Sequence, residues 1–495
     1  MAFEKTKIRT VSNATIVLAD MDTEQDDALS LTFATGYKSS KVMGFDFPYI
    51  LINEYRIKRV ELTSFEIDCS NFLPILHMKL IVSNNEFIAQ KLPKDGDIAS
   101  VYLRSYNDVY KPIRNDYLIT HVETTYLNDL EPSTIFYITG ILNIKKIWVE
   151  QNKAFKGTSI DVIKKVASEL QLGFATNIED PTDDEMVWIC DWKSYKDFIL
   201  HITDHSWRNE NTFYRSFIDV YYNVNFIEVE KQFDQTKKFD EALAIFQRNV
   251  FDVADPNLTI NDADQPNKKQ DLILSNLEYG TNSNFKITNY ELVNNSSAIS
   301  YSQGYGKKMY FYDHTLKTIS EENMIEFNPL STPGTEDTKI RLRGLKDETI
   351  EKEHLKNIWN GIQYSLPNGN VHQKYALAFH QNFTNNKELE KMYIDIDLWG
   401  WNPAVIKMER IPIIIFITDN FQDSSVYMSK DEINSNKQNT NLPLLSLYPT
   451  VDRFLSGFFV VEGFKIVYDV TIGRITAKYK LTRREWGVPQ SEDIF

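Results

Sequence analysis

His201 and His205 lie four residues apart in a segment whose apolar spacing predicts a helix. Two imidazoles at this spacing share one helical face and can bind the same zinc ion. The residues between them lack the glutamate of a metalloprotease helix, and no third ligand follows at a recognisable spacing. We therefore interpret the pair as solvated or packed histidines, and we predict neither a metal nor a cofactor.

Other segments carry suggestive residues in incomplete patterns. Asn261–Asp264 is rich in oxygen ligands but lacks the turn glycine and closing glutamate of an EF-hand loop, so we interpret it as an acidic linker. Gly304 and Gly306 are not followed by the third glycine of a dinucleotide loop. The sequence has no nucleophile elbow and no P-loop. Paired glycosidase carboxylates stay possible because their spacing is spatial, but no catalytic residue is predicted.

Asp395 and Asp397 belong to an alternating segment, Tyr393–Trp399. A period of two places Ile394, Ile396 and Leu398 on one face of a strand and the two aspartates on the other. One interpretation is an ordinary half-buried strand with a solvated face. The other is that repeated copies of such strands line an acidic channel, which makes Asp395 and Asp397 our bore-lining candidates.

The overall charge argues against nucleic-acid binding. The chain has 495 residues, a formal net charge of −15 and a pI near 5.2. Proteins that grip phosphates show a basic stripe, whereas the lysines and arginines here are scattered and outnumbered. A negative lumen would instead let a polyanion pass without binding. The 30 Phe and 26 Tyr residues favour strands.

Cysteine use and hydropathy predict a soluble chain made in a reducing cytoplasm. Only Cys69 and Cys190 are present, which is no disulfide framework. The N-terminus lacks the apolar core of a signal peptide. The longest apolar run, Ile411–Ile417, contains Pro412 and is too short to span a bilayer, so we predict no membrane contact.

Residues 1–152 are predicted to form a first β domain, because short apolar runs alternate with turn-rich pieces. The expected strands are Ala14–Leu18, Arg56–Asp68, Leu76–Ser83, Ala99–Leu103, Tyr117–Thr124 and Ile135–Trp148. Strands at this spacing favour a barrel or sandwich over a βαβ fold.

Residues 153–250 are predicted to form a mixed α/β insertion. In Gly157–Phe174 the apolar positions step by three or four, which predicts a helix capped by Thr158 or Ser159 and ended by a left-handed Gly173. A second helix is expected to start near Ser194. One long strand is expected over Phe213–Val229, where the spacing changes to a period of two.

A polar linker is predicted over residues 251–271, followed by a second β domain at 272–495 that carries helical and loop insertions. The clearest element is a terminal hairpin that turns at Gly473-Arg474, with Phe464–Ile472 and Ile475–Leu481 as its arms. Other strands are expected at Leu272–Glu278, Phe285–Val293, Ala298–Gly304, Met309–Asp313, Ala376–Phe379, Met392–Trp399 and Ile411–Thr418. A helix is expected at Asp347–Ile362 and a polar loop at Asn420–Thr440. The predicted class is mainly β with α insertions (α+β).

Three passages resemble the baseplate hub proteins of contractile-tailed bacteriophages and the related hub module of type VI secretion spikes. The first runs from Gly96–Ile98 through Arg114–Thr120 and Ile138–Leu142 into the helix after Gly157. The second is Met186–Cys190 with Trp192–Ile199, ahead of Phe213–Val229. The third is His380–Asn382 with Lys387–Met392 and Gly400–Pro403. The resemblance covers roughly two thirds of the chain, and neither the Asn420–Thr440 loop nor the tail after Trp486 matches it.

The resemblance implies two tube-type antiparallel β-barrel domains per chain and a homotrimeric ring with pseudo-sixfold symmetry. Its expected neighbours are the tail tube protein, the central spike protein and baseplate wedge proteins. DNA and the tape measure would pass through the bore without specific binding. Such a protein is expected in the virion tail baseplate after assembly in the host cytoplasm.

Two other interpretations stay open. A tail hub can carry a cell-wall-degrading (muralytic) activity, which turnover of purified peptidoglycan would detect. A secreted carbohydrate-binding β protein is a third class, and the missing signal peptide counts against it.

Overall fold

The computed structural model describes most of the β-rich regions and the insertion between them. The described residues are 5–11, 14–19, 47–83, 87, 91–103, 113–127, 133–179, 181–209, 212–233, 273–276, 286–295, 308–313, 317–323, 362–366, 371–372, 374–401, 403, 405–416, 451–452, 454–470 and 473–483. The fold is mainly β with few helices, as the sequence predicts. None of the described helices has the length and hydrophobicity needed to cross a bilayer.

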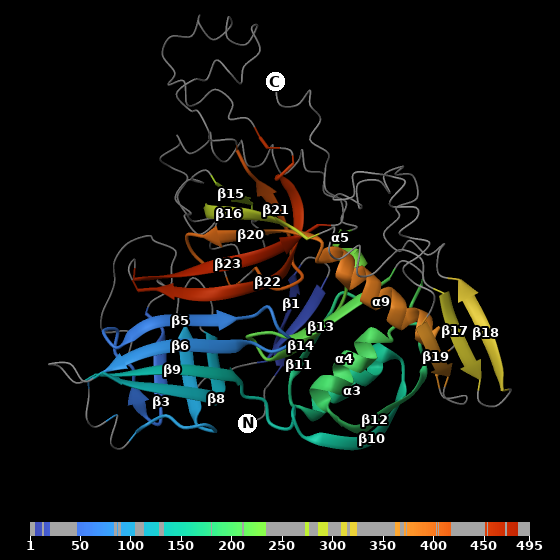
Figure 1. Cartoon of the computed structure of the whole chain (residues 1–495), viewed down its shortest axis with the longest axis horizontal. Helices are drawn as coiled ribbons and strands as arrows, with labels where there is room; N and C mark the ends of the chain where they lie inside the picture. The colour runs from blue at the N-terminus through green and yellow to red at the C-terminus, as the bar shows by residue number, and fades with distance from the viewer. Residues whose placement is uncertain are drawn as a thin grey trace, which may run out of the picture.

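A 13-stranded, almost wholly antiparallel sheet, here the large sheet, is built from both ends of the chain (Figure 1). Its main path runs β16-β20-β23-β22-β5-β6-β9-β8-β7-β3-β4, with β15 and β21 joined at β22. The early strands are β3 (Tyr49–Ile52), β4 (Tyr55–Arg56), β5 (Leu62–Asp68), β6 (Ile75–Val82), β7 (Ile98–Leu103), β8 (Ile113–Leu127) and β9 (Ser133–Leu142). The late strands are β15 (Leu274–Ser275), β16 (Ile287–Asn294), β20 (Met392–Leu398), β21 (Arg410–Ile414), β22 (Gly457–Asp469) and β23 (Arg474–Thr482).

The two groups of strands meet where β5 pairs with β22, a contact we call the seam. Ile67 lies opposite Ile466 and Phe65 opposite Tyr468 across this antiparallel ladder. A β-bulge between Val461 and Gly463 bends β22 at the end of the seam. The bend brings the backbone of Ser70 so close to Gly463 that a Cβ there would lie 2.8 Å from the Ser70 Cα. Gly463 is therefore required by the packing of the seam.

The insertion consists of two small sheets packed around two helices. A five-stranded sheet has the order β1-β2-β11-β14-β13, and β10 pairs with β12 in a separate two-stranded ribbon. The strands are β1 (Lys5–Val11), β2 (Ala14–Ala19), β10 (Glu150–Gly157), β11 (Gly173–Thr176), β12 (Met186–Ser194), β13 (Tyr214–Ile218) and β14 (Asn223–Glu228). The helices are α3 (Ser159–Glu169), α4 (Tyr195–Asp204) and the short α5 (Val229–Phe233). The first residues of the chain thus complete the sheet of the insertion.

Both main helices begin where their caps predict. The Thr158 and Ser194 side chains accept the backbone N–H of Asp161 and Asp197, respectively, and satisfy donors that the first helical turn leaves unpaired. Their apolar stripes are buried, with Val162, Ile163, Phe198 and Ile199 almost fully covered.

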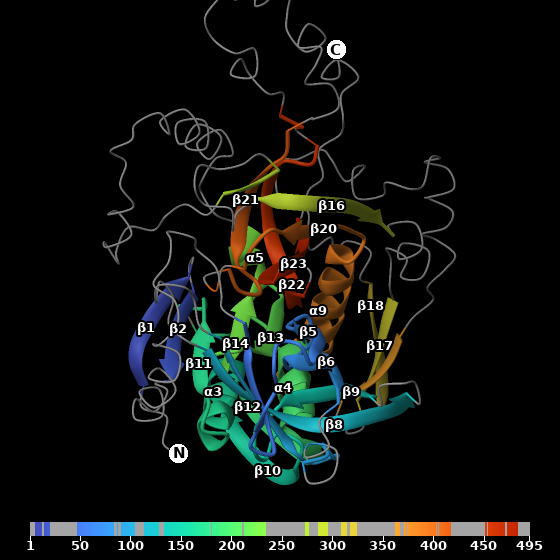
Figure 2. The same ribbon diagram turned by 90° about the vertical axis from the view of Figure 1, so that its left-hand side faces the viewer.

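Helix α9 (Tyr375–Leu389) lies beside the insertion, although it comes from the later part of the chain (Figure 2). It contacts α4. Next to it, β17 (Lys308–Asp313), β18 (Thr318–Asn323) and β19 (Ile362–Leu366) form a three-stranded sheet of order β18-β17-β19. One large apolar cluster includes buried side chains of both strand groups and of the insertion, for example Phe65, Ile163 and Ile466.

Several strand predictions are confirmed, among them β6, β7, β20 and the terminal hairpin β22–β23 with its left-handed Gly473. The strand predicted over Ile135–Trp148 ends at Leu142, because the following residues turn with Lys146 at a positive φ. The strand predicted over Arg56–Asp68 is interrupted by a turn in which the Glu61 carboxylate accepts the Lys58 N–H.

Three local predictions are wrong. Gly173 does not end α3: the left-handed residue is Gln171, and the Leu172 N–H donates to the Ala167 carbonyl to close the helix. Ala376–Phe379 lies in α9 rather than in a strand. Phe213–Val229 is a hairpin and not one strand, because Asp219 accepts the Tyr221 and Asn223 N–H groups and turns the chain.

Some predicted features lie outside the described residues. These are the linker at 251–271, Asn261–Asp264, the strand at Ala298–Gly304, Gly304 with Gly306, the Asn420–Thr440 loop, the tail after Trp486 and the helix at Asp347–Ile362 apart from Ile362, which begins β19. The predicted domain limits stay predictions.

Candidate functional site

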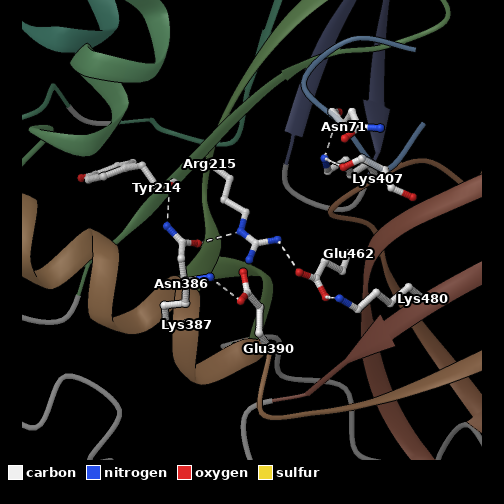
Figure 3. Close-up of polar contacts among 10 residues, drawn as sticks. Asn71, Tyr214, Arg215, Asn386, Lys387, Glu390, Lys407, Glu462 and Lys480 are labelled. Atoms are coloured by element: carbon white, nitrogen blue, oxygen red, sulfur yellow. Dashed lines mark hydrogen bonds and ion pairs between the residues drawn. The ribbon is translucent and has the colours of Figure 1, made fainter. Parts of the chain in front are cut away.

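The insertion, α9 and the large sheet meet at a set of polar side chains that we call the junction. Its members are Arg215 of β13, Asn382 and Asn386 of α9, Lys407 and Glu462. Figure 3 shows Arg215 between Asn386 and Glu462, with Lys480 on the far side of Glu462. Because these residues come from three parts of the sequence, the junction sets how those parts are held together.

Asn382 is the most densely bonded member of the junction. Its amide nitrogen lies 3.0 Å from the carbonyl oxygens of Asp204 and Ser206 and 3.2 Å from that of Thr203. Its amide oxygen accepts the N–H of Tyr214 at 2.9 Å. The last carbonyls of a helix have no partner within it, so this buried side chain of α9 caps the C-terminal end of α4 and also holds the start of β13.

Arg215 links α9 to the large sheet. Its Nε donates to the Asn386 side-chain oxygen at 2.6 Å, and its terminal nitrogen lies 3.3 Å from the Glu462 carboxylate. Glu462 also pairs with Lys480 at 3.1 Å. Glu462 stands in the bulge of β22, so the irregularity that bends the seam also presents the carboxylate that binds the insertion.

Lys407 contacts all three parts of the fold. Its ammonium donates to the carbonyls of Ser70 at 2.7 Å and Asn71 at 3.2 Å, next to β5. It also lies 5.1 Å from the ring centroid of Phe217 in β13, within cation–π range. Burial, and then repulsion from Arg215, lower the pKa of Lys407 to about 7. The amine keeps N–H donors for the two carbonyls in either protonation state.

The β13–β14 turn reaches the early strands of the large sheet. The Asn115 side chain donates to the Val220 carbonyl at 2.7 Å, and the Asp116 N–H donates to the Tyr222 hydroxyl at 3.0 Å. On the other side, the Tyr221 hydroxyl donates to the carbonyl of Pro403 at 3.1 Å. One hairpin of the insertion therefore bonds to both strand groups.

His201 of α4 and His205, which follows its last residue, pack against the start of α9. The His205 ring stacks on Tyr375 with centroids 3.8 Å apart, and the Tyr375 hydroxyl lies 3.1 Å from His201 Nε2. A third histidine, His372, donates from Nε2 to the His205 carbonyl at 3.0 Å. We call these four residues the histidine cluster. Across the described residues, no group of three or more His, Cys, Asp or Glu side chains is arranged to hold a metal ion.

The histidine cluster disfavours positive charge. Burial, and then repulsion from Lys193, lower the pKa of His201 to about 4. Burial, and then repulsion from His201, lower the pKa of His205 to about 3. Burial also lowers the pKa of His372. These side chains are therefore neutral at pH 7, which agrees with the interpretation of packed histidines.

Asp395 and Asp397 point to the polar side of β20, as their spacing predicts: Asp395 is exposed and Asp397 half-buried, while Ile394 and Ile396 are buried. Lys480 and Lys478 of β23 lie opposite Asp395 and Asp397 in the ladder. The Lys478 ammonium is 3.7 Å from the Asp397 carboxylate. Cations therefore alternate with carboxylates on this face, which is not uniformly acidic.

Glu291 of the edge strand β16 lies opposite Asp395 on its other side. Partial burial raises the pKa of Asp395, repulsion from Glu291 raises it further, and Lys480 lowers it. This polar face continues across the seam, where Lys465 lies 2.8 Å from the Glu66 carboxylate and 3.5 Å from that of Asp68. The two bore candidates thus belong to a charged face that spans both strand groups.

No protein-family profile and no curated protein sequence matches this chain. Solved structures similar to it include the following three. A tail protein from Neisseria meningitidis MC58 gives a TM-score of 0.45 at 8% identity over 89% of this chain and 97% of that one. The 43 kDa tail protein of prophage MuSo2 from Shewanella oneidensis gives a TM-score of 0.46 at 7% identity, over 89% of this chain and 98% of that one. A chain of the Francisella PdpA–VgrG complex gives a TM-score of 0.40 at 12% identity, over 94% of this chain and 64% of that one.

Two of these neighbours are tail proteins, and the third belongs to a PdpA–VgrG complex.

Sequence reasoning missed the junction. It proposed no role for Arg215, Lys407 or Glu462, and it found Asn382 only within a passage that resembles hub proteins. One signal was present: Gln381, Asn382 and Asn385 are spaced as neighbours on one helical face, and all three are buried. A buried amide stripe on a helix indicates a polar docking face, because buried amides require partners.

Proposed function

We propose that this chain is a structural component of a phage tail baseplate: a hub whose three copies form a ring between the tail tube and the central spike. The observation that carries the proposal is the architecture. Two groups of alternating β-strands, one before and one after a mixed insertion, share one antiparallel sheet. On this proposal the early and late strands of the large sheet, which lie within residues 1–152 and 272–495, belong to two tube-type barrel domains per chain.

Symmetry explains why such a chain would be useful. A sixfold tube and a threefold spike cannot both repeat on a ring of identical single-domain subunits. Three copies of a chain with two similar β domains present six similar surfaces to the tube and three identical ones to the spike. Head-to-tail contacts between copies close such a ring.

The bore of the proposed ring would be lined by the polar face that carries Asp395 and Asp397. This face has carboxylates beside lysines, and the chain as a whole has a charge of −15. A surface without a basic stripe offers DNA few phosphate contacts, so DNA and the tape measure would slide past it. The proposed partners are the tail tube, spike and baseplate wedge proteins, in the virion after assembly in the host cytoplasm.

Assembly with purified tail tube and spike proteins of the same phage tests the proposal. We expect light scattering to give three times the 57.7 kDa chain mass in the presence of the spike. Electron micrographs should then show a ring between tube and spike. A chain that stays monomeric with both proteins present, and is absent from tube–spike complexes, would contradict the proposal. Turnover of purified peptidoglycan, assayed on the same sample, would favour the muralytic alternative instead.

A further inference from the structure

The β10–β12 ribbon lies at the lower margin of the insertion (Figures 1 and 2). Four large apolar side chains, two in β12 and two just before β10, are exposed. Trp148 is 44% exposed, Val149 52%, Ile189 48% and Trp192 67%. We call these four residues the tryptophan patch. Single exposed apolar residues are normal on a surface, but two exposed tryptophans in one short ribbon and the turn that leads into it are typical of an interaction site.

The fold does not need Trp192 in this position. Gln151 pairs with Lys193 and Asn152 with Asp191, so Trp192 is the extra residue of a β-bulge. Its backbone has a φ of 46°, which is uncommon for a bulky side chain. By contrast, Trp188 of the same strand is fully buried and donates to the Gly157 carbonyl at 3.0 Å. Trp188 serves the core, whereas the bulge turns Trp192 out to solvent, and such backbone outliers point to function.

Lysines outnumber carboxylates in the sequence around the patch, although the exposed Asp191 precedes Trp192 and Lys153 pairs with Glu169 at 2.7 Å. Residues 145–156 contain four lysines, Lys145, Lys146, Lys153 and Lys156, against one glutamate. The Lys196 ammonium lies 5.0 Å from the Trp148 ring centroid. Lys193 is the neighbour of Trp192 in the bulge and is half-buried. In a chain of net charge −15 this segment is a local basic island.

We infer that the tryptophan patch is the surface with which each copy of this chain docks on a negatively charged face of the next copy, an inference that rests on the proposed ring. Charge complementarity identifies the occupant: residues 145–156 carry a net +3, which leaves −18 on the rest of each copy. A twofold contact would bring the lysines of two patches together and is disfavoured. A basic patch that meets a different, acidic surface makes a heterologous contact, the kind that closes rings.

The first test compares the oligomeric state of the full-length wild type with that of W148S/W192S by sedimentation across a concentration series. Tryptophans in interface centres are often worth a factor of roughly 30 or more in affinity. We expect the dissociation constant of the self-assembly to rise by at least that factor. Tyr126→Ser is the matched control, because Tyr126 is a 63% exposed aromatic in β8, outside the patch, and it should leave assembly unchanged.

A charge variant, K156E/K193E, keeps the inference testable if the tryptophan variant folds poorly. It should also weaken assembly, and raising the salt concentration should weaken that of the wild type, because screening reduces charge attraction. Wild-type assembly that persists in both variants would overturn this inference and leave the hub proposal standing. A wild type that joins tube and spike but never contacts another copy would overturn it too. A chain that self-assembles through the patch yet ignores tube and spike would instead contradict the hub proposal alone.

Discussion

The seam and the junction hold different parts of the fold together by different chemistry: the seam joins the early and late strands of the large sheet, and the junction joins the insertion and α9 to that sheet. At the seam, β5 and β22 pair through backbone groups, with apolar side chains such as Ile67 and Ile466 opposite one another. At the junction, the contacts are made by two side-chain amides, one guanidinium, one ammonium and one carboxylate, for example those of Asn382, Arg215 and Glu462. A backbone ladder tolerates many side chains, whereas buried side-chain bonds depend on each partner. Single substitutions should therefore be felt most at the junction.

The largest expected effect is that of Asn382→Ala. It would leave three carbonyls and one N–H without their side-chain partner in a buried site. At roughly 1 kcal/mol or more for each unsatisfied buried group, we expect a loss of about 4 kcal/mol in the free energy of unfolding. Urea denaturation measures this loss, and Phe383→Ala, at a 44% exposed position of the same helix, is the control. If both substitutions lowered the free energy of unfolding by the same amount, the capping role assigned to Asn382 would be contradicted.

The position of the seam most sensitive to substitution should be Gly463. Gly463→Ala places a Cβ against the backbone of Ser70, which cannot move aside as a flexible side chain would. We expect a loss of about 3 kcal/mol, the upper range for overpacking. Ile466→Val, a smaller change on the same strand, should cost about 1 kcal/mol. If Gly463→Ala were neutral in thermal unfolding, the close approach at the seam would be disproved.

The histidine cluster, at the contact between α4 and α9, should make the stability of the protein depend on pH. The histidines of the cluster have lowered pKa values in the folded protein, so the unfolded chain binds more protons below pH 6.5. Their stabilising effect is complete above pH 6.5 and declines as the pH falls towards about 4 and then 3. For His205, 4% exposed, we expect a loss of about 2 kcal/mol between pH 7 and pH 5.

The groups that face the histidine cluster define the control. Besides burial, repulsion from Lys193 lowers the pKa of His205, whereas attraction to Asp184 and Asp183 raises the pKa of His372 in opposition to burial. Burial raises the pKa of Asp204 to about 6, so the folded protein binds this proton more readily than the unfolded chain does. As the pH falls through 6, Asp204 therefore increases the free energy of unfolding while the histidines decrease it. His205→Asn keeps a donor for the Tyr375 carbonyl but cannot titrate. Unfolding curves of this variant should lose most of the pH dependence, and an unchanged slope would assign it to other groups.

The smallest expected effect is the coupling between Arg215 and Glu462. Both side chains are mostly buried, at 15% and 11% exposure, and each has a second partner. A double-mutant cycle with Arg215→Met and Glu462→Gln should give a coupling of about 1 kcal/mol. A coupling of zero would mean that the ion pair contributes nothing, and that Arg215 and Glu462 are held by their second partners, Asn386 and Lys480.

The sequence predicts those helices and strands whose formation depends on residues close together in the chain. The caps at Thr158 and Ser194 and the terminal hairpin depend on residues within one or two turns of each other, and these predictions are confirmed. The β13–β14 turn was missed, because buried β14 shows no alternation and Asp219 was not recognised as a turn residue. The junction was missed for a different reason. The Asn382 bonds join residues that are 168 to 179 positions apart, and no local pattern reports such a partner.

The seam also has a consequence for the time at which the protein is made. Lys465 and Glu66, which meet across it, are 399 residues apart. At about 5–20 residues per second, a ribosome would need roughly 20–80 s to supply β22 after β5 has emerged. During that interval β5 is an unpaired edge, and such edges invite wrong partners. Glu66 and Asp68 place negative charge along this edge, and charged side chains on an edge strand disfavour pairing with a wrong strand. The same carboxylates bind Lys465 once β22 has been made.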